Sequence, residues 1–216
     1  MRKLSVLFED DDVLAVDKPE GLASIPERDT TQESLLSLLS AARRTKLYVV
    51  HRLDKEVSGV ILFAKNAAAH KFLNEQFSHH IIRKTYLTLV HGVVAQENGT
   101  IDAPLRQFGS GRMGVDSKRG KESVTTFQVL KRFNSHTLVE AHPVTGRRHQ
   151  IRVHCYSVGH PIVGDPLYGE REMQRRFPRL MLHARRIEYR LPPGGPCAVE
   201  APLPESFADV MRMIKG

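Results

Sequence analysis

An aspartate lies in a short, highly charged break between two apolar runs of the sequence VVHRLDKEVSGVILFAK. The flanking runs, 47–50 and 60–64, are short, branched and uncharged, as is typical of buried strands. The break, 51–58, carries Asp54 among nearly every ionisable residue type. A plain hairpin would place Asn-Gly or Asp-Gly at its turn, whereas Gly59 comes last here. The break is either a solvated connection or a rigid platform that presents reactive groups.

A second charged stretch, HPVTGRRHQIRVH, places arginines at the start of an expected helix over 148–158. Arg148 and Arg152 are four residues apart, which puts them on one helical face. The opposite, buried side is expected to carry Ile151, His154, Cys155 and Val158. Arginines in the first turns oppose the helix dipole, so stability alone does not favour them. They form either a solvated basic face or a site for a phosphate or a buried carboxylate, and Asp54 could supply that anion.

The composition indicates a globular protein with a polyanionic partner. The 216 residues are 41% hydrophobic, enough for a proper core, and Lys plus Arg exceed Asp plus Glu by 32 to 24, a net charge of +8. That excess favours nucleic acid over a membrane. Two cysteines exclude a secreted disulfide framework, and no run approaches the roughly 20 apolar residues of a membrane span. The N-terminus does not have the form of a signal peptide, so we expect a cytoplasmic protein.

The remaining elements predict one α+β domain. A helix over 67–77 has Asn66 as its N-cap, and 84–94 alternates like a long strand. The segments 124–131 and 137–141 are expected to pair as a hairpin. Residues 106–123 have no apolar period and are rich in Gly, Arg and Lys, which predicts a mobile basic loop.

Several segments of the sequence resemble those of a known enzyme family. HRLDKEVSGVILFAK is similar to the HRLDxxTSG signature of RNA pseudouridine synthases of the RluA type. Five further segments resemble parts of that family in the same chain order: LAVDKPEGLASIP, KTYLTLVHG, PVTGRRHQIRVH, GHPIVGDPLYG and LMLHARRIEY. One departure lies inside the signature, where Val57 replaces the usual threonine; losing that hydroxyl is expected to loosen the loop.

The resemblance implies both fold and reaction. The fold is a single catalytic domain over 1–216, with a mixed, mainly antiparallel central sheet flanked by helices and no separate S4 RNA-binding domain. The reaction is the isomerisation of uridine to pseudouridine within structured RNA, transfer RNA or ribosomal RNA or both, without a cofactor. The target base is flipped out of its stack first.

Roles for individual residues follow from the same resemblance. Asp54 corresponds to the catalytic aspartate, and Arg152 to the basic residue that pairs with it. Tyr86 corresponds to the active-site tyrosine that stacks on the target base, and Leu182 falls near the apolar wall of the pocket. Arg52 matches the arginine that enters the stack as the uridine leaves it.

Further residues are assigned to binding. Substrate contacts are expected from His51, Arg147 and Arg148, and RNA backbone contacts from Arg175, Arg176, Arg185 and Arg186. A solvated face is the ordinary interpretation of such an arginine-rich run. The histidines near Cys155 match no zinc spacing, and we expect His154 to be a core residue and no metal to be bound.

Other interpretations remain open. Asp54 alone is more often a turn former, Tyr86 a packing strand residue and Leu182 simple core. The main alternative function is a catalytically inactive RNA-binding or chaperone module of the same fold. A metal-dependent nuclease would need a carboxylate cluster that the sequence lacks. We expect a monomer, because no coiled coil or long apolar surface helix demands a dimer.

Overall fold

A computed structural model describes residues 4–27, 33–192 and 194–214 of the chain. By its contacts the chain divides into two compact units, each described by itself below. The first comprises Met1–Lys84 and Ala184–Pro202, and the second comprises Thr85–His183 and Leu203–Gly216. The expectation of a single domain over 1–216 stays a prediction.

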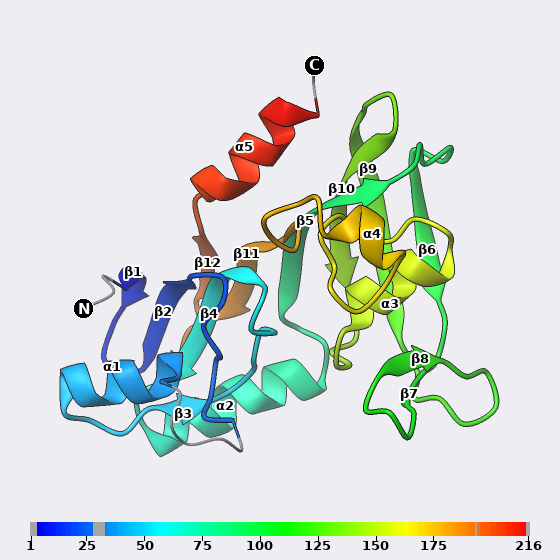
Figure 1. The fold of residues 1–216 in the computed structure, drawn as a ribbon. Coiled ribbons are helices and arrows are strands. Elements are labelled where there is room, and N and C mark those ends of the chain that lie inside the picture. The colour runs from blue at the N-terminus through cyan, green and yellow to red at the C-terminus, as the bar shows by residue number, and fades with distance from the viewer. Residues whose placement is uncertain (1–3, 28–32, 193, 215–216) are drawn as a thin grey trace. The chain divides into compact units, whose positions relative to one another are not determined.

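The first unit is built on a sheet with strand order β1, β2, β4 and β11, in which β12 pairs with β11 and β3 with β4 (Figure 1). The strands are β1 (Ser5–Glu9), β2 (Val13–Lys18), β3 (Tyr48–Val49), β4 (Ser58–Ala64), β11 (Leu182–Arg190) and β12 (Pro196–Glu200). Its helices are α1 (Leu35–Arg43) and α2 (Ala67–Ser78). The predicted N-cap of α2 is confirmed, because the Asn66 side chain accepts a hydrogen bond from the Ala69 amide at 2.9 Å.

Strand β4 begins at the last residue of the charged break, 51–58, and connects it to the hydrophobic core. Val60 and Leu62 belong to one apolar cluster together with Leu73 of α2. The alternate residues Ile61 and Phe63 point to the other face of the sheet and are also fully buried. A strand buried on both faces needs a continuous apolar run, which explains why the sequence of β4 does not alternate.

The second unit contains a sheet with strand order β5, β10, β9 and β6, in which neighbours pair antiparallel. Its strands are β5 (Arg83–His91), β6 (Asn98–Asp102), β9 (Val124–Arg132) and β10 (His136–Pro143). The predicted hairpin over 124–141 is therefore confirmed, while β5 ends three residues before the expected limit at 94. Together with the helices, these sheets give the α+β class that the sequence predicts.

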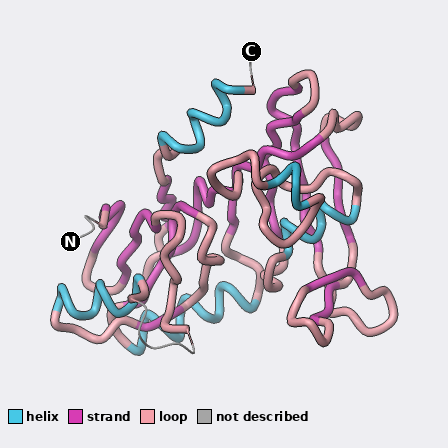
Figure 2. The backbone as a smooth tube through the Cα atoms, viewed as in Figure 1, coloured by secondary structure: helices cyan, strands magenta, loops and turns pink. Residues whose placement is uncertain are grey.

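The segment 106–123 is not wholly a loop, so that expectation was wrong. It contains part of a two-stranded hairpin of β7 (Leu105–Gln107) and β8 (Met113–Val115), whose short strands stand between longer loops in Figure 2. The hairpin is anchored by Leu105, which is 1% exposed and packs with Val153 and Tyr168, and by the partly buried Met113, which packs against the same cluster. Two anchor residues eight positions apart in a polar segment leave no periodic signal in the sequence.

The helices of the second unit are α3 (Gln150–Ser157), α4 (Arg171–Gln174) and α5 (Glu205–Met213). The predicted start of α3 at 148 is wrong, because His149 adopts a left-handed conformation with φ 55°. The side chain of Gln150 closes the preceding turn by accepting hydrogen bonds from the Arg147 amide at 3.0 Å and the Thr145 hydroxyl at 2.6 Å. On the expected buried side, Val158 is 49% exposed, in contrast to the other three residues.

Within the described part of the chain, no helix is long and apolar enough to cross a membrane.

Candidate active site

Asp54 lies half-buried in the connection between β3 and β4. Its carbonyl accepts a hydrogen bond from the Val57 amide at 3.1 Å, which closes a tight turn. The Val57 side chain is buried at 3% exposure. The turn is thus closed by backbone atoms, and its hydrogen bond does not involve the hydroxyl that a threonine would add at position 57.

The neighbours of Asp54 on both sides are tied to the KPEGLAS segment. The Ser24 hydroxyl donates to the Leu53 carbonyl at 2.7 Å and accepts from the Leu53 amide at 3.1 Å. The ammonium group of Lys18, which is fully buried, donates to the Lys55 carbonyl at 3.1 Å and to the Leu22 carbonyl at 2.8 Å. Asp54 is therefore presented by a backbone that is fixed immediately before and after it. Sequence reasoning missed both supporting residues, although they lie inside a segment that it had singled out.

His51 is part of the support of this loop. Its Nε2 atom accepts a hydrogen bond from the Leu62 amide at 2.9 Å, and its ring lies 5.0 Å from that of Phe77. Burial, with a smaller effect of the Lys84 charge, lowers the pKa of His51 to about 3. Burial also lowers the pKa of Lys84 to about 8. A neutral imidazole that accepts a backbone hydrogen bond has a clear structural role, and its assignment to substrate binding stays a prediction.

The arginines of the first unit differ in their surroundings. Arg52 and Arg185 are exposed. Arg186 donates to Glu188 at 2.9 Å and to Glu200 at 2.5 Å, so its charge is balanced by two carboxylates. These hydrogen bonds raise the pKa of Arg186 above its usual value. Of Arg185 and Arg186, which both lie on β11, Arg185 is the one whose charge is not balanced by these two carboxylates.

Arg152 of α3 is buried in an ion pair with Asp165. Its Nε and Nη2 atoms donate to the two carboxylate oxygens at 2.8 and 2.7 Å, and the side chains are 1% and 0% exposed. Arg148 precedes α3 and is exposed, so the expectation that it shares a helical face with Arg152 was wrong. The cause is His149, which lies between them in a left-handed conformation, so that α3 begins only after it and does not include Arg148.

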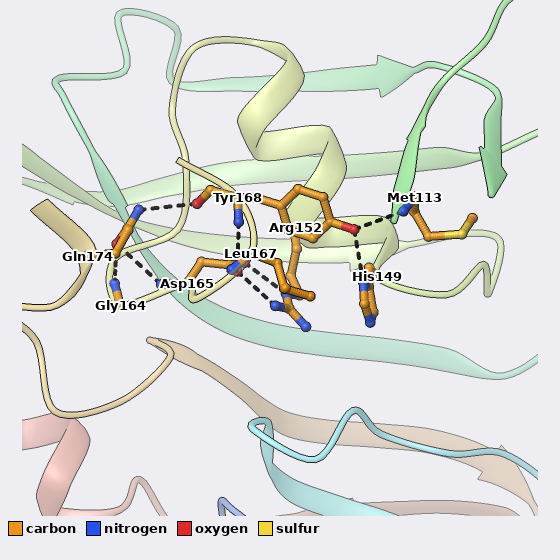
Figure 3. A network of polar contacts seen from close by, with 8 residues as sticks. All are labelled: Met113, His149, Arg152, Gly164, Asp165, Leu167, Tyr168 and Gln174. Atoms are coloured by element: carbon orange, nitrogen blue, oxygen red, sulfur yellow. Dashed lines mark hydrogen bonds and ion pairs between the residues drawn. The ribbon is translucent and has the colours of Figure 1, made fainter. Parts of the chain in front are cut away.

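Tyr168 adds a second contact to the Arg152 guanidinium. The guanidinium carbon lies 5.3 Å from the centre of the tyrosine ring. The tyrosine hydroxyl accepts from the Met113 amide at 3.2 Å and lies 2.9 Å from His149 Nδ1 (Figure 3). The β7–β8 hairpin, the turn before α3 and the segment after Asp165 therefore meet at one ring. Sequence reasoning named neither Asp165 nor Tyr168 for the site, although both belong to GHPIVGDPLYG.

The other predicted residues of the second unit are spread over several elements. Tyr86 on β5 is half-buried and pairs with Ala141 of β10. Leu182 is 3% exposed, which suits a pocket wall and simple core equally well. Arg147 is exposed, and its Nε donates to the Glu122 carbonyl at 3.0 Å. Exposed positions just after α4 are occupied by Arg175 and Arg176.

The histidine and cysteine of α3 have core surroundings. His154 is fully buried, with its ring nitrogens 2.9 Å from the Thr125 hydroxyl and 3.1 Å from the Ala103 carbonyl, as expected for a satisfied core histidine. Burial raises the pKa of Cys155 to about 12, so its thiol stays protonated at neutral pH. Among the described residues, no group of three or more His, Cys, Asp or Glu side chains is placed to hold a metal ion.

Comparison with known proteins gives the family. A family model described as RNA pseudouridylate synthase matches residues 12–157. The dual-specificity RNA pseudouridine synthase RluA of Vibrio cholerae is 39% identical over 183 residues, covering 84% of this chain and 75% of that protein. The ribosomal large subunit pseudouridine synthase D of Pseudomonas aeruginosa is 36% identical over 237 residues, covering 99% and 72%.

A solved structure agrees with these relatives. Human RNA pseudouridylate synthase domain containing 4 has a TM-score of 0.81 at 26% identity, with 98% of this chain and 93% of that chain covered. The resemblance inferred from the motifs and the predicted α+β fold class are both confirmed. The chain therefore belongs to the RluA-type RNA pseudouridine synthases and is an isomerase that acts on RNA.

Proposed function

We propose that this protein isomerises specific uridines in structured RNA, transfer RNA or ribosomal RNA or both, with Asp54 as the catalytic aspartate. The observation that carries the proposal is the loop itself. Asp54 is held between Leu53 and Lys55, whose backbone groups are bound by the buried side chains of Ser24 and Lys18. A carboxylate on a rigid support is suited to chemistry, because catalysis requires reacting groups in a fixed geometry.

The charge of the protein favours the same conclusion. With a net charge of +8, the protein attracts polyanions. A carboxylate repels phosphate, so a pure RNA-binding protein has no need for one at the site where RNA approaches. An aspartate kept in the signature loop of a basic protein is better explained by a chemical task.

The proposed reaction is balanced without a cofactor. The C1′–N1 bond of the target uridine breaks, the uracil turns within its pocket, and C1′ forms a bond to C5. The hydrogen on C5 is lost to solvent, and N1 gains a proton. An oxygen nucleophile or base beside the sugar is needed, and Asp54 supplies it. The other requirement is a group of residues that retains the free base.

We assign the supporting roles as the family resemblance implies. Arg152 is the basic partner of the catalytic aspartate, Tyr86 stacks on the target base, and Leu182 lines the pocket. Arg52 fills the gap that the flipped uridine leaves in the RNA stack, as a planar cation can do. The exposure of Arg52 is consistent with such a role.

RNA backbone contacts are assigned to exposed arginines. Arg175 and Arg176 follow α4, and Arg185 lies on β11, all three exposed. Contacts of this kind position RNA without reading its sequence. Arg147 and Arg148, exposed in the turn before α3, remain candidates for substrate contact. The cytoplasmic location and the monomeric state inferred from the sequence stay predictions.

Tritium release tests the function directly. Transfer and ribosomal RNA transcripts that carry 5-tritiated uridine are incubated separately with the wild type and with Asp54→Asn. Wild-type release from at least one RNA, no release by the variant and equal RNA affinity of both would support the proposal. Comparable release by Asp54→Asn would overturn the role of that residue. Absence of release from any RNA, despite RNA binding by the wild type, would favour the inactive RNA-binding module.

A further inference from the structure

The Arg152–Asp165 ion pair is not explained by stability. Both side chains are almost fully buried, at 1% and 0% exposure. Removing two charges from water is costly, and apolar residues of similar volume are often at least as stabilising. The pair joins the Arg152 side chain of α3 to Asp165, thirteen residues later in the chain. It therefore fixes the orientation of the guanidinium, which apolar contacts alone would leave less defined.

The Asp165 carboxylate is held in place by its own turn. Besides Arg152, its Oδ1 atom accepts from the Leu167 amide at 2.9 Å and from the Tyr168 amide at 3.1 Å (Figure 3). Each of these bonds restricts the rotation of the carboxylate. Asp165 can therefore act as a fixed reference for the guanidinium rather than as a counter-ion that moves with it.

A buried glutamine on α4 fixes the turn in its place. Gln174 is 5% exposed, and its Oε1 atom accepts from the Gly164 amide at 2.6 Å and the Asp165 amide at 3.2 Å. The same atom lies 3.2 Å from His91 Nε2, and the Gln174 amide nitrogen donates to the Tyr168 carbonyl at 3.3 Å. Figure 3 shows Gln174 and Arg152 on opposite sides of this turn.

The guanidinium is thus restrained along one edge and across one face. The edge formed by Nε and Nη2 is bound to Asp165, and the plane is in contact with the Tyr168 ring at 5.3 Å. A planar group held by a bidentate bond and a ring contact has a single orientation. An orientation set this firmly is what an arginine needs in order to act on a reacting group.

We propose that Asp165 is a positioning residue, which holds the Arg152 guanidinium in the orientation that isomerisation requires. This inference rests on the proposed function, in which Arg152 acts at the site of the target uridine. Asp165 touches no reacting atom itself and acts only through Arg152. Gln174 supports it by fixing the amides of the turn that carries it.

The experiment is tritium release under single-turnover conditions, with saturating enzyme and at a temperature below the thermal transition of every variant. Asp165→Asn keeps the shape of the side chain and removes its charge. We expect a fall of about a hundredfold in the rate constant, as for a misplaced catalytic group, with unchanged RNA affinity. A wild-type rate constant in Asp165→Asn, alongside an active wild type, would overturn this inference and leave the proposed function intact. An inactive wild type would overturn both.

A matched variant separates positioning from stability. Thr137 is fully buried in the same unit, donates to the Gly92 carbonyl at 2.8 Å and accepts from the Val94 amide at 3.0 Å. Thr137→Val should lower the melting temperature but not the rate constant of the folded enzyme. If it slows the reaction as much as Asp165→Asn, the effect is general and the inference fails.

A double-mutant cycle tests whether Asp165 acts through Arg152. Arg152→Gln combined with Asp165→Asn should react as slowly as Arg152→Gln alone, because the arginine to be positioned is gone. Multiplying effects would refute the connection. If Asp165→Asn does not fold, Gln174→Ala replaces it in the same cycle. We expect Gln174→Ala to lower the rate constant about tenfold, and to have no effect in the Arg152→Gln background. A wild-type rate constant in Gln174→Ala would contradict the inference.

Discussion

The Ser24 hydroxyl binds both backbone groups of Leu53, donating to its carbonyl at 2.7 Å and accepting from its amide at 3.1 Å. Leu53 directly precedes Asp54, so a residue thirty positions earlier in the chain sets the position of the candidate catalytic group. Both of these hydrogen bonds are buried.

Ser24→Ala should therefore reduce both stability and turnover. The change leaves a buried amide and carbonyl without this partner, at a cost of about 1–3 kcal/mol in the free energy of unfolding. Urea unfolding measures the first effect and tritium release the second. Ser78→Ala, at an exposed position, serves as the control and should change neither by a measurable amount. Full turnover in Ser24→Ala would show that the loop does not depend on this contact.

His51 should make the protein less stable in acid. Its pKa is about 3 in the folded state and near 6.5 in the unfolded chain, so the folded state binds fewer protons between these values. Stability contributed by neutral His51 is therefore complete above pH 6.5 and is lost as the pH falls toward 3. The slope is at most about 1.4 kcal/mol per pH unit for one proton.

Urea unfolding of the wild type and His51→Gln at about pH 7, 5 and 4 checks this. Other buried histidines, such as His91 and His154, have pKa values lowered by burial and add to the acid sensitivity of both proteins. The difference between the two proteins isolates His51 and should shrink as the pH falls. A constant difference would mean that His51 does not titrate in this range.

Arg175 and Arg176 should contribute to the salt dependence of RNA binding. Both are exposed, and each phosphate contact that is lost reduces the magnitude of the negative slope of log affinity against log salt by about 0.7–0.9. The double alanine variant should bind more weakly, with a slope that is smaller in magnitude by about one to two. Arg186→Ala is the comparison: the sequence predicts an RNA contact for Arg186 as well, but we expect a smaller change in slope because Glu188 and Glu200 already balance its charge. Equal slopes for the wild type and the double variant would remove both arginines from the RNA path.

Gly59→Ala should be strongly destabilising. Gly59 has φ +115°, and a Cβ atom there would lie 2.2 Å from the Ala184 carbonyl oxygen. Gly21 provides the comparison, because it also has a positive φ, +76°, but nothing lies within 4 Å of its Cβ position. Gly21→Ala should cost only backbone strain, about 1–2 kcal/mol, and Gly59→Ala clearly more. Thermal melts of both variants compare them, and equal losses would show that strain alone decides.

Local features of this protein were predictable from the sequence. Asn66 caps α2 because its side chain bonds to an amide three residues on, an interaction that needs no distant partner. The β9–β10 hairpin and the uncharged run of β4 likewise follow from short-range pattern and continuous burial. The charged break with Asp54 was visible because its composition differs from both neighbours, and the motif order identified the family.

Tertiary structure alone decided how the candidate residues are held. Arg148 and Arg152 have the same spacing and type as a solvated pair, yet one is exposed and the other is buried against Asp165. The difference arises because His149 takes a left-handed conformation and Gln150 closes the turn before it, through bonds to groups as distant as the Val124 carbonyl. Bonds between residues far apart in sequence carry no local period, so the sequence shows which residues could do chemistry, and only the folded chain shows what fixes them.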